Sequence, residues 1–168
     1  MEIRKRIDFR KVFAIAYIVV SLTFITIGLQ PAEATSRDIQ SSAINIPSIG
    51  LVSSVTKLAL KNHRLDTPNT IVGSYKKKNS NKTFLVAHST TAFKNLKFIH
   101  DNDTIAYDGK LYRVNNIVSM KKEDIDMDEL LRADKNGRPT IILMTCAGEL
   151  YDNGDASHRL IVTATLQG

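Results

Sequence analysis

The chain has 168 residues, 43% of them apolar and 24% charged, which is enough for one packed domain and too little for two large ones. Its formal net charge is +6, but half of that charge lies in residues 1–11, which carry five basic and two acidic side chains. Elsewhere Lys76, Lys77 and Lys78 form the only tight basic cluster, and the chain has no Trp. A nucleic-acid site needs basic residues gathered on one face, so the charge pattern argues against a nucleic-acid partner.

An uncharged run of 18 residues, 12–29, follows the basic start. As a helix it would be about 27 Å long, close to the hydrocarbon thickness of a bilayer, and its apolar residues lie on every side. Basic residues before the run place the N-terminus in the cytoplasm and the rest of the chain outside. We therefore predict a cytoplasmic tail (1–11), a transmembrane anchor (12–29), a stalk (30–42) and an extracytoplasmic domain (43–168).

A cleaved signal peptide is the alternative to an anchor. Ala32-Glu33-Ala34 has the small-x-small form of a signal peptidase site. The apolar run, however, is longer than the 7–15 residues usual for a signal peptide. We favour the uncleaved anchor, and both alternatives place the domain outside the cell.

Short segments rich in β-branched residues, separated by turn residues, follow the stalk and are typical of an all-β domain. Asp108-Gly109, between two of them, is a strong hairpin signal. Short helices are expected at 56–62, 91–99 and 123–133. The whole pattern predicts an eight-stranded closed β-barrel with helical insertions. The predicted strands are 43–46, 51–55, 70–74, 83–89, 103–108, 110–120, 140–146 and 159–166.

Three ionisable residues stand at the ends of predicted strands. Cys146 is the only Cys, so the domain has no internal disulfide, and it ends one strand just before a loop, 147–158. Arg159 begins the last strand, and His88 lies near the end of another. A Cys with a nearby His is the arrangement of an activated thiol nucleophile, and a guanidinium can stabilise the oxyanion that forms on its substrate.

Four segments together resemble the sortase family. The stretch Ile142-Leu143-Met144-Thr145-Cys146 is similar to the sortase signature Thr-Leu-x-Thr-Cys, with Ile142 in place of the first Thr. We expect that departure to affect packing rather than chemistry. The other three segments are Arg159–Ala164, Val86–Ser89 and Ile44–Gly50. The resemblance runs in the family's order from about Ala43 to Leu166, nearly the whole exported part, and the single N-terminal membrane segment belongs to it too.

The resemblance implies a cysteine transpeptidase on the outer face of a bacterial cytoplasmic membrane. Cys146 would be the nucleophile, His88 the general acid and base, and Arg159 the stabiliser of the oxyanion or substrate backbone. Thr145 and Ser89 would contact the substrate. The partners would be exported proteins with a C-terminal LPxTG-like sorting motif and an amine from peptidoglycan or a pilin.

No cofactor is expected, although some sortases bind calcium before the seventh strand. Glu123, Asp124 and Asp126 stand there, but without EF-hand spacing, and an acidic helix start explains them equally well.

Other functions remain open on the sequence. A hydrolytic cysteine peptidase would use the same three residues with water as acceptor. An L,D-transpeptidase is disfavoured, because Met144-Thr145 stands where that class has Ser-x-Gly before the Cys. In a non-enzymatic anchored barrel, Cys146 would be buried and inert.

Overall fold

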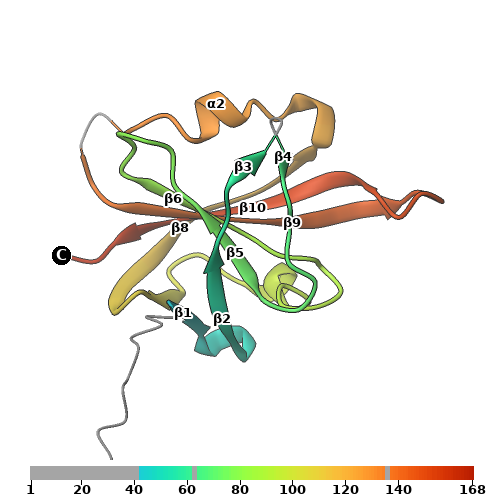
Figure 1. Ribbon diagram of the computed structural model, residues 1–168. Coiled ribbons are helices and arrows are strands. Elements are labelled where there is room, and N and C mark those ends of the chain that lie inside the picture. Colours follow the sequence, from blue (N-terminus) through green and yellow to red (C-terminus); the bar gives the residue numbers. More distant parts are fainter. Residues whose placement is uncertain (1–41, 62–63, 135–136) are drawn as a thin grey trace, which may run out of the picture. The chain divides into compact units, whose positions relative to one another are not determined.

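The computed structural model describes residues 42–61, 64–134 and 137–168 (Figure 1). The predicted tail, anchor and nearly all of the stalk lie outside these residues. Among the residues that are described, no helix is long and apolar enough to cross a membrane.

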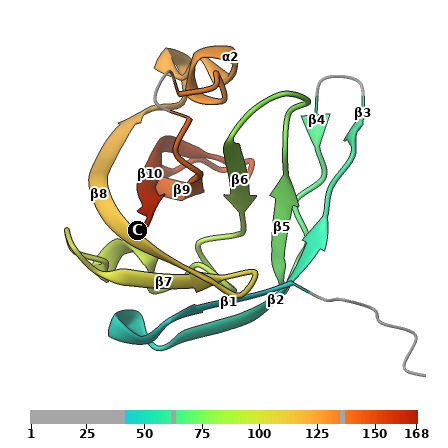
Figure 2. The same cartoon turned by 90° about the vertical axis from the view of Figure 1, so that its left-hand side faces the viewer.

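Eight strands close into a barrel in the order β1-β2-β5-β6-β9-β10-β8-β7 (Figure 2), which confirms the predicted fold class. Most neighbours are antiparallel, but β2 pairs with β5 and β6 pairs with β9 in parallel. A small hairpin, β3–β4, stands outside the barrel. The barrel strands are β1 Ala43–Ile46, β2 Leu51–Lys57, β5 Val72–Tyr75, β6 Lys82–Val86, β7 Thr104–Tyr107, β8 Lys110–Lys121, β9 Thr140–Leu150 and β10 Ala156–Leu166. The hairpin strands are β3 Leu60–Lys61 and β4 Arg64–Leu65.

Strand alternation divides the apolar residues between two clusters. Side chains that point into the barrel, such as Leu85, Leu143 and Val162, are fully buried in the larger cluster. Their neighbours along the strands, Phe84, Val86, Ile142 and Ile161, point outward and form a second cluster with Leu131 of the connection between β8 and β9. The barrel therefore has an apolar outer face on β6, β9 and β10 as well as an apolar interior.

The connection between β8 and β9 lies against this outer face. It contains two short helical pieces, η3 (Lys122–Asp124) and α2 (Met127–Leu130). The turn before β6 and the first residue of β6 hold the end of α2, because the buried Ser80 hydroxyl donates to the Leu131 carbonyl at 3.0 Å and Lys82 Nζ donates to the Leu130 carbonyl at 3.0 Å. The connection is thus fixed to the barrel where α2 ends.

The predicted turn at Asp108-Gly109 is confirmed. Both residues have positive φ, +51° and +70°, as a two-residue hairpin between β7 and β8 requires.

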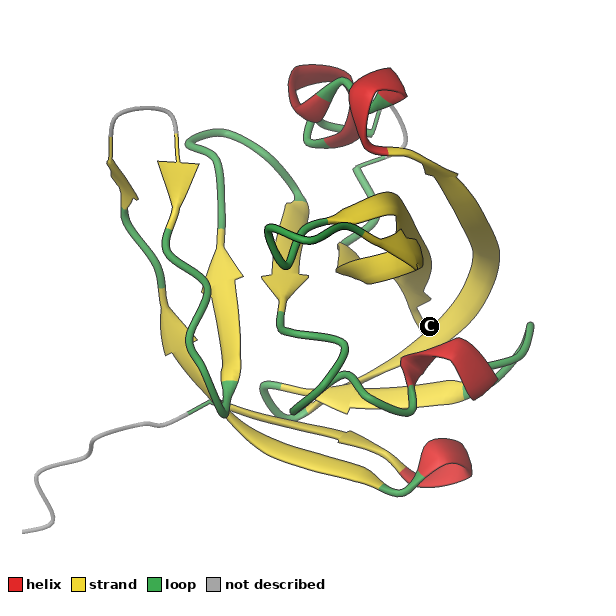
Figure 3. Ribbon diagram, turned by 90° about the vertical axis from the view of Figure 1, so that its right-hand side faces the viewer, coloured by secondary structure: helices red, strands yellow, loops and turns green. Residues whose placement is uncertain are grey.

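The predicted helices were largely wrong (Figure 3). Residues 56–57 continue β2 because they pair with Gly73 and Ser74 of β5. Segment 91–99 is a series of turns with one 3-10 turn, η2 (Leu96–Phe98), although Phe93, Leu96 and Ile99 are buried in the barrel cluster. Segment 123–133 contains only η3 and α2. Helices this short gain too little from their own hydrogen bonds, so packing decides their form.

Candidate active site

The sequence predicted Cys146 at the end of a strand, but the structure places it within β9. Strand β9 continues to Leu150, and the predicted long loop 147–158 is instead the end of the β9–β10 hairpin, which projects beyond the barrel (Figure 1). Ala147 pairs with His158, and the register shifts between Ala156 and His158. Gly148 adopts φ +76° at this irregularity, a conformation in which a β-carbon would be strained and would meet Ser157.

The structure places Cys146 and Arg159 directly opposite each other on β9 and β10. Side chains of directly paired residues in an antiparallel ladder lie on the same face. Ile142 and Met144 share that face of β9 and belong to or pack against the outer cluster, so Cys146 and Arg159 lie on the outside of the barrel. Cys146 is half-buried, and the structure describes it as a free thiol.

His88 follows β6 on the same side of the barrel. The parallel register of β6 and β9 pairs Lys82 with Thr140 and ends with Val86 beside Met144; continued by two residues, it would bring His88 beside Cys146. The bond from Thr145 Oγ1 to the Ala87 carbonyl, 2.8 Å, extends the contact between the two segments past the end of the ladder. Cys146 and Arg159 therefore form a row across β9 and β10, and His88 follows the end of β6, the strand that pairs with β9 on its other side.

The contact of Thr145 with substrate stays a prediction, and the structure gives this residue a packing role. Its side chain is 4% exposed, points to the interior side of β9, and is occupied by the bond to Ala87. Thr145 instead fixes the segment that carries His88 to the strand that carries Cys146.

Ser89 is half-buried and directly follows His88, and its role in substrate contact stays a prediction. Turns follow Ser89, and the His88 carbonyl accepts hydrogen bonds from the backbone N–H groups of Thr91 and Phe93. The Thr91 hydroxyl is buried without a hydrogen-bond partner among the described residues.

The guanidinium of Arg159 is held at the base of the hairpin end. Its Nη1 donates to the carbonyls of Ala156 and His158, both at 2.9 Å, and its Nη2 donates to Asp155 Oδ1 at 2.7 Å. The other Asp155 oxygen accepts from Lys122 Nζ on η3. These hydrogen bonds, from Lys122 first and Arg159 second, hold the pKa of the Asp155 carboxyl well below its ordinary value of 3.8.

A groove of about 930 Å³ runs along the outer cluster beside this row. Its apolar lining includes Phe84, Val86 and Met144, and Arg159 contributes to its edge. One side is lined by residues of the β3–β4 hairpin and the other by η3 and α2. The lining residues stop at Met144 and Val86, two positions before Cys146 and His88 on each strand. An extended chain lying on this apolar floor would therefore reach the row of ionisable residues at its end.

Comparison with known proteins decides the family. A sortase-domain model matches residues 44–167. The chain belongs to the sortase family. Sortases are cysteine transpeptidases, so the chain is a member of a transpeptidase family. A search among curated proteins finds no match.

Solved sortase structures are similar to this one over about three quarters of the chain. Sortase A from Corynebacterium diphtheriae is 25% identical with a TM-score of 0.59, and the match covers 76% of this chain and 60% of that one. Sortase C-1 from Actinomyces oris is 28% identical with a TM-score of 0.57, covering 76% and 71%. Sortase A from Listeria monocytogenes, 16% identical with a TM-score of 0.58 over 76% and 87%, supports the fold alone. The matches include both sortase A and sortase C, so the subclass stays open.

The acidic residues considered for calcium in this sortase lie along the groove. Asp126 is the N-cap of α2, where its Oδ1 accepts from the backbone of Asp128 and Glu129 at 2.9 and 3.1 Å. Glu123 and Asp124 are exposed on η3. Within the described part of the chain, no group of three or more His, Cys, Asp or Glu residues is arranged to hold a metal ion.

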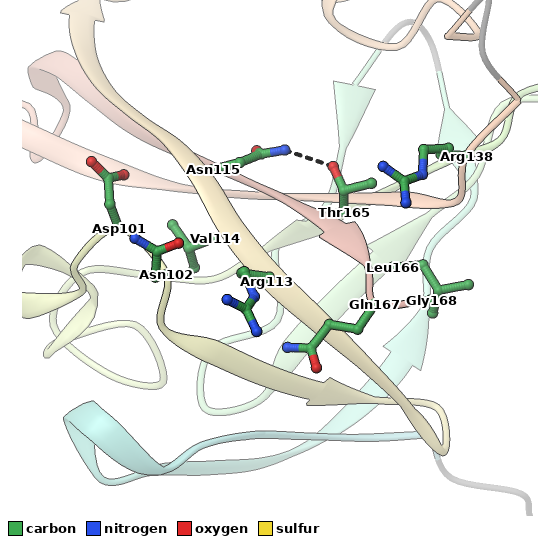
Figure 4. Close-up of a pocket in the computed structure, with 10 residues that line it drawn as sticks. All are labelled: Asp101, Asn102, Arg113, Val114, Asn115, Arg138, Thr165, Leu166, Gln167 and Gly168. Carbon is green, nitrogen blue, oxygen red and sulfur yellow. Dashed lines mark hydrogen bonds between the residues drawn. The ribbon is translucent and has the colours of Figure 1, made fainter.

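A second hollow, about 640 Å³, lies away from this row, beside the start of β8 and the C-terminal end of β10 (Figure 4). Asn115 Nδ2 donates to Thr165 Oγ1 at 2.7 Å across its upper edge, and Arg113 and Arg138 line it. No Cys or His is among its ten labelled residues, so nucleophilic chemistry has no candidate there.

Sequence reasoning missed Asp155 and Lys122 as neighbours of Arg159. Asp155 follows the Asn153-Gly154 turn and looked like a turn residue, and Lys122 belongs to a different segment, more than thirty positions earlier in the chain. Only the hairpin geometry brings the three together, and no local pattern in the sequence indicates that.

Proposed function

We propose that this sortase is a cysteine transpeptidase that cleaves a short LPxTG-like sorting motif in exported proteins and joins the new C-terminus to an amine of the cell wall or of a pilin. The observation that supports the proposal is the direct pairing of Cys146 with Arg159 beside the apolar groove, with His88 two residues past the last β6 residue that pairs with β9. A Cys beside an imidazole and a guanidinium supplies a nucleophile, a proton carrier and an oxyanion donor in one place.

The first half of the reaction forms a thioester. The Cys146 thiolate attacks the carbonyl carbon of the scissile peptide bond, and Arg159 donates hydrogen bonds to the negative oxygen of the tetrahedral intermediate. The C–N bond then breaks, and His88 gives its proton to the departing amine. The N-terminal part of the substrate stays attached to Cys146 through a new C–S bond.

The second half transfers the acyl group. An incoming amine attacks the thioester carbonyl and loses a proton to His88, and the C–S bond breaks to restore the thiolate. Thioesters react with amines far more readily than with water of equal access, so a bound amine diverts the intermediate from hydrolysis.

The proposed location is the outer face of a bacterial cytoplasmic membrane, with the N-terminus inside. The support is the basic start and the 18-residue uncharged run, both in the sequence outside the described residues. Protease treatment of intact protoplasts tests this proposal: we expect the barrel domain to be digested from outside, and a domain protected until lysis would contradict the orientation.

The half-buried state of Cys146 argues against a purely structural thiol, which would be sealed from solvent. The hydrolytic alternative needs a product assay. The full chain would be incubated with an LPxTG peptide library, with and without hydroxylamine and short peptides bearing a free amine. Amide or hydroxamate products support transpeptidation, whereas free acid as the only product across all amines would favour a peptidase.

A further inference from the structure

The guanidinium of Arg159 has five N–H donors in a rigid planar fork. Three of them are used within the chain: both on Nη1, for the carbonyls of Ala156 and His158, and one on Nη2, for Asp155. The Nε–H and the second Nη2–H make no hydrogen bond among the described residues. The side chain is only 12% exposed, so the fork is held in one orientation with two donors left for a ligand.

Asp155 is itself held rigidly. Its Oδ1 accepts from its neighbour's backbone at Ala156, 2.9 Å, as well as from Arg159, and its Oδ2 accepts from Lys122. Its backbone is fixed by the turn, because Tyr151 N donates to the Asp155 carbonyl at 2.8 Å and Asn153 Oδ1 accepts from Asp155 N at 3.0 Å. Both carboxylate oxygens are therefore engaged, and the charge stays ionised because the two cations lower the pKa of the group.

The cluster joins two walls of the groove. Lys122 lies on η3, in the connection between β8 and β9, whereas Asp155 and Arg159 lie on the β9–β10 hairpin. Segment η3 contacts β10, and both Lys122 and Arg159 line the groove. A peptide in the groove would touch both cationic ends of this cluster.

We infer that Asp155 is a positioning residue, which with Lys122 holds the Arg159 fork so that its two free donors face the carbonyl oxygen of the substrate. The inference rests on the proposed function, because it assigns Arg159 to the oxyanion. Without Asp155 the guanidinium would keep its charge but lose one of the contacts that orient it. A misplacement of about 1 Å is enough to lower a rate about a hundredfold.

The test compares thioester formation in the full chain with an LPxTG peptide, followed by mass spectrometry. We expect Asp155→Ala to slow this step about tenfold to a hundredfold, mainly in kcat rather than KM. Asp155→Asn keeps an acceptor oxygen and should recover part of the rate, and Lys122→Met should have a smaller effect. Asp152→Asn, an exposed carboxylate of the same hairpin end, and Lys121→Met, the exposed neighbour of Lys122, are the matched controls and should react like the wild type.

A second measurement does not depend on activity. The Arg159 Nε–H resonance in a 15N-labelled chain should shift or exchange faster in Asp155→Ala and stay unchanged in Asp152→Asn. An Asp155→Ala chain that forms thioester as fast as the wild type, or keeps the Arg159 resonance unchanged, would overturn the inference. A faster Asp155→Ala chain would also overturn it, because Asp155 would then hold Arg159 away from the substrate. A wild type that forms no thioester with any peptide would refute the proposed function, while the resonance would still decide whether Asp155 fixes Arg159.

Discussion

The two faces of strand β9 differ in what their residues do, although the residues alternate one by one along the same segment. On the inner face, Ile141, Leu143 and Thr145 are almost completely buried, and the single polar side chain among them donates a hydrogen bond to Ala87, just after β6. On the outer face, Ile142 is buried, whereas Met144 and Cys146 are half-buried. The inner face fixes the position of the strand. The outer face is packed at Ile142 and partly accessible at Met144 and Cys146.

This difference explains how a barrel can place a reactive thiol accurately. A thiol on a loop would be accessible but mobile, whereas Cys146 belongs to a β-ladder in which it pairs with a residue of β10. The position of the thiol is fixed by the buried inner face of the strand. Substitutions on the two faces should therefore separate stability from chemistry.

The largest effect is expected at the outer end of the strand. Cys146→Ala removes the nucleophile, so thioester formation should fall below detection by mass spectrometry, while the free energy of unfolding changes by less than about 1 kcal/mol, since the thiol is only half-buried. A variant that loses activity and is also strongly destabilised would mean that Cys146 belongs to the core.

Leu143 and Met144 are adjacent residues on opposite faces and provide a matched pair. Leu143→Ala leaves a cavity inside the barrel and should lower the free energy of unfolding by about 2–5 kcal/mol, with normal kcat in the molecules that remain folded. Met144→Ala should cost about 1 kcal/mol in stability but raise KM, because Met144 lines the groove. Denaturant unfolding and steady-state kinetics check both variants, and the reverse pattern would contradict the assignment of the two faces.

Thr145 tests the link between the faces. Thr145→Val keeps the shape but leaves the Ala87 carbonyl without its partner, which should cost about 1–3 kcal/mol in the free energy of unfolding. Because Ala87 precedes His88, we also expect a lower kcat. Thr145→Ser retains the hydroxyl and should restore most of both quantities; if it fails to do so, the hydrogen bond is not the reason.

The alternation that separates these faces could be predicted from the sequence, and so could the barrel. The short β-branched segments, the Asp108-Gly109 turn and the alternation of side chains along β10 can all be recognised from residues that are close together in the sequence. The end of β9 could not be predicted in this way. Residues 147–150 look like a loop because of Gly148, and only pairing with β10 makes them a strand. The contact between Lys122 and Asp155 likewise depends on how distant segments meet.

The smallest effect concerns the carboxylate beside Arg159. Its pKa is lower in the folded chain than in the unfolded one, so the stability it contributes is present above about pH 3.8 and is lost as the pH falls through the folded value. We expect the Asp155 carboxyl carbon, followed by NMR, to titrate below 3.8 and to return toward that value in Lys122→Met. A titration at or above 3.8 in the wild type would show that the Lys122 and Arg159 contacts do not persist in solution.

The most direct test of the account is a structure of the full chain with a sorting-motif peptide linked covalently to the Cys146 sulfur. The account predicts that the peptide lies along Val86 and Met144 in the groove, with its carbonyl oxygen within hydrogen-bond distance of the Arg159 guanidinium and the His88 ring near the sulfur. A peptide that leaves the groove, or a His88 ring more than about 10 Å from the sulfur, would contradict the shared role of the three residues.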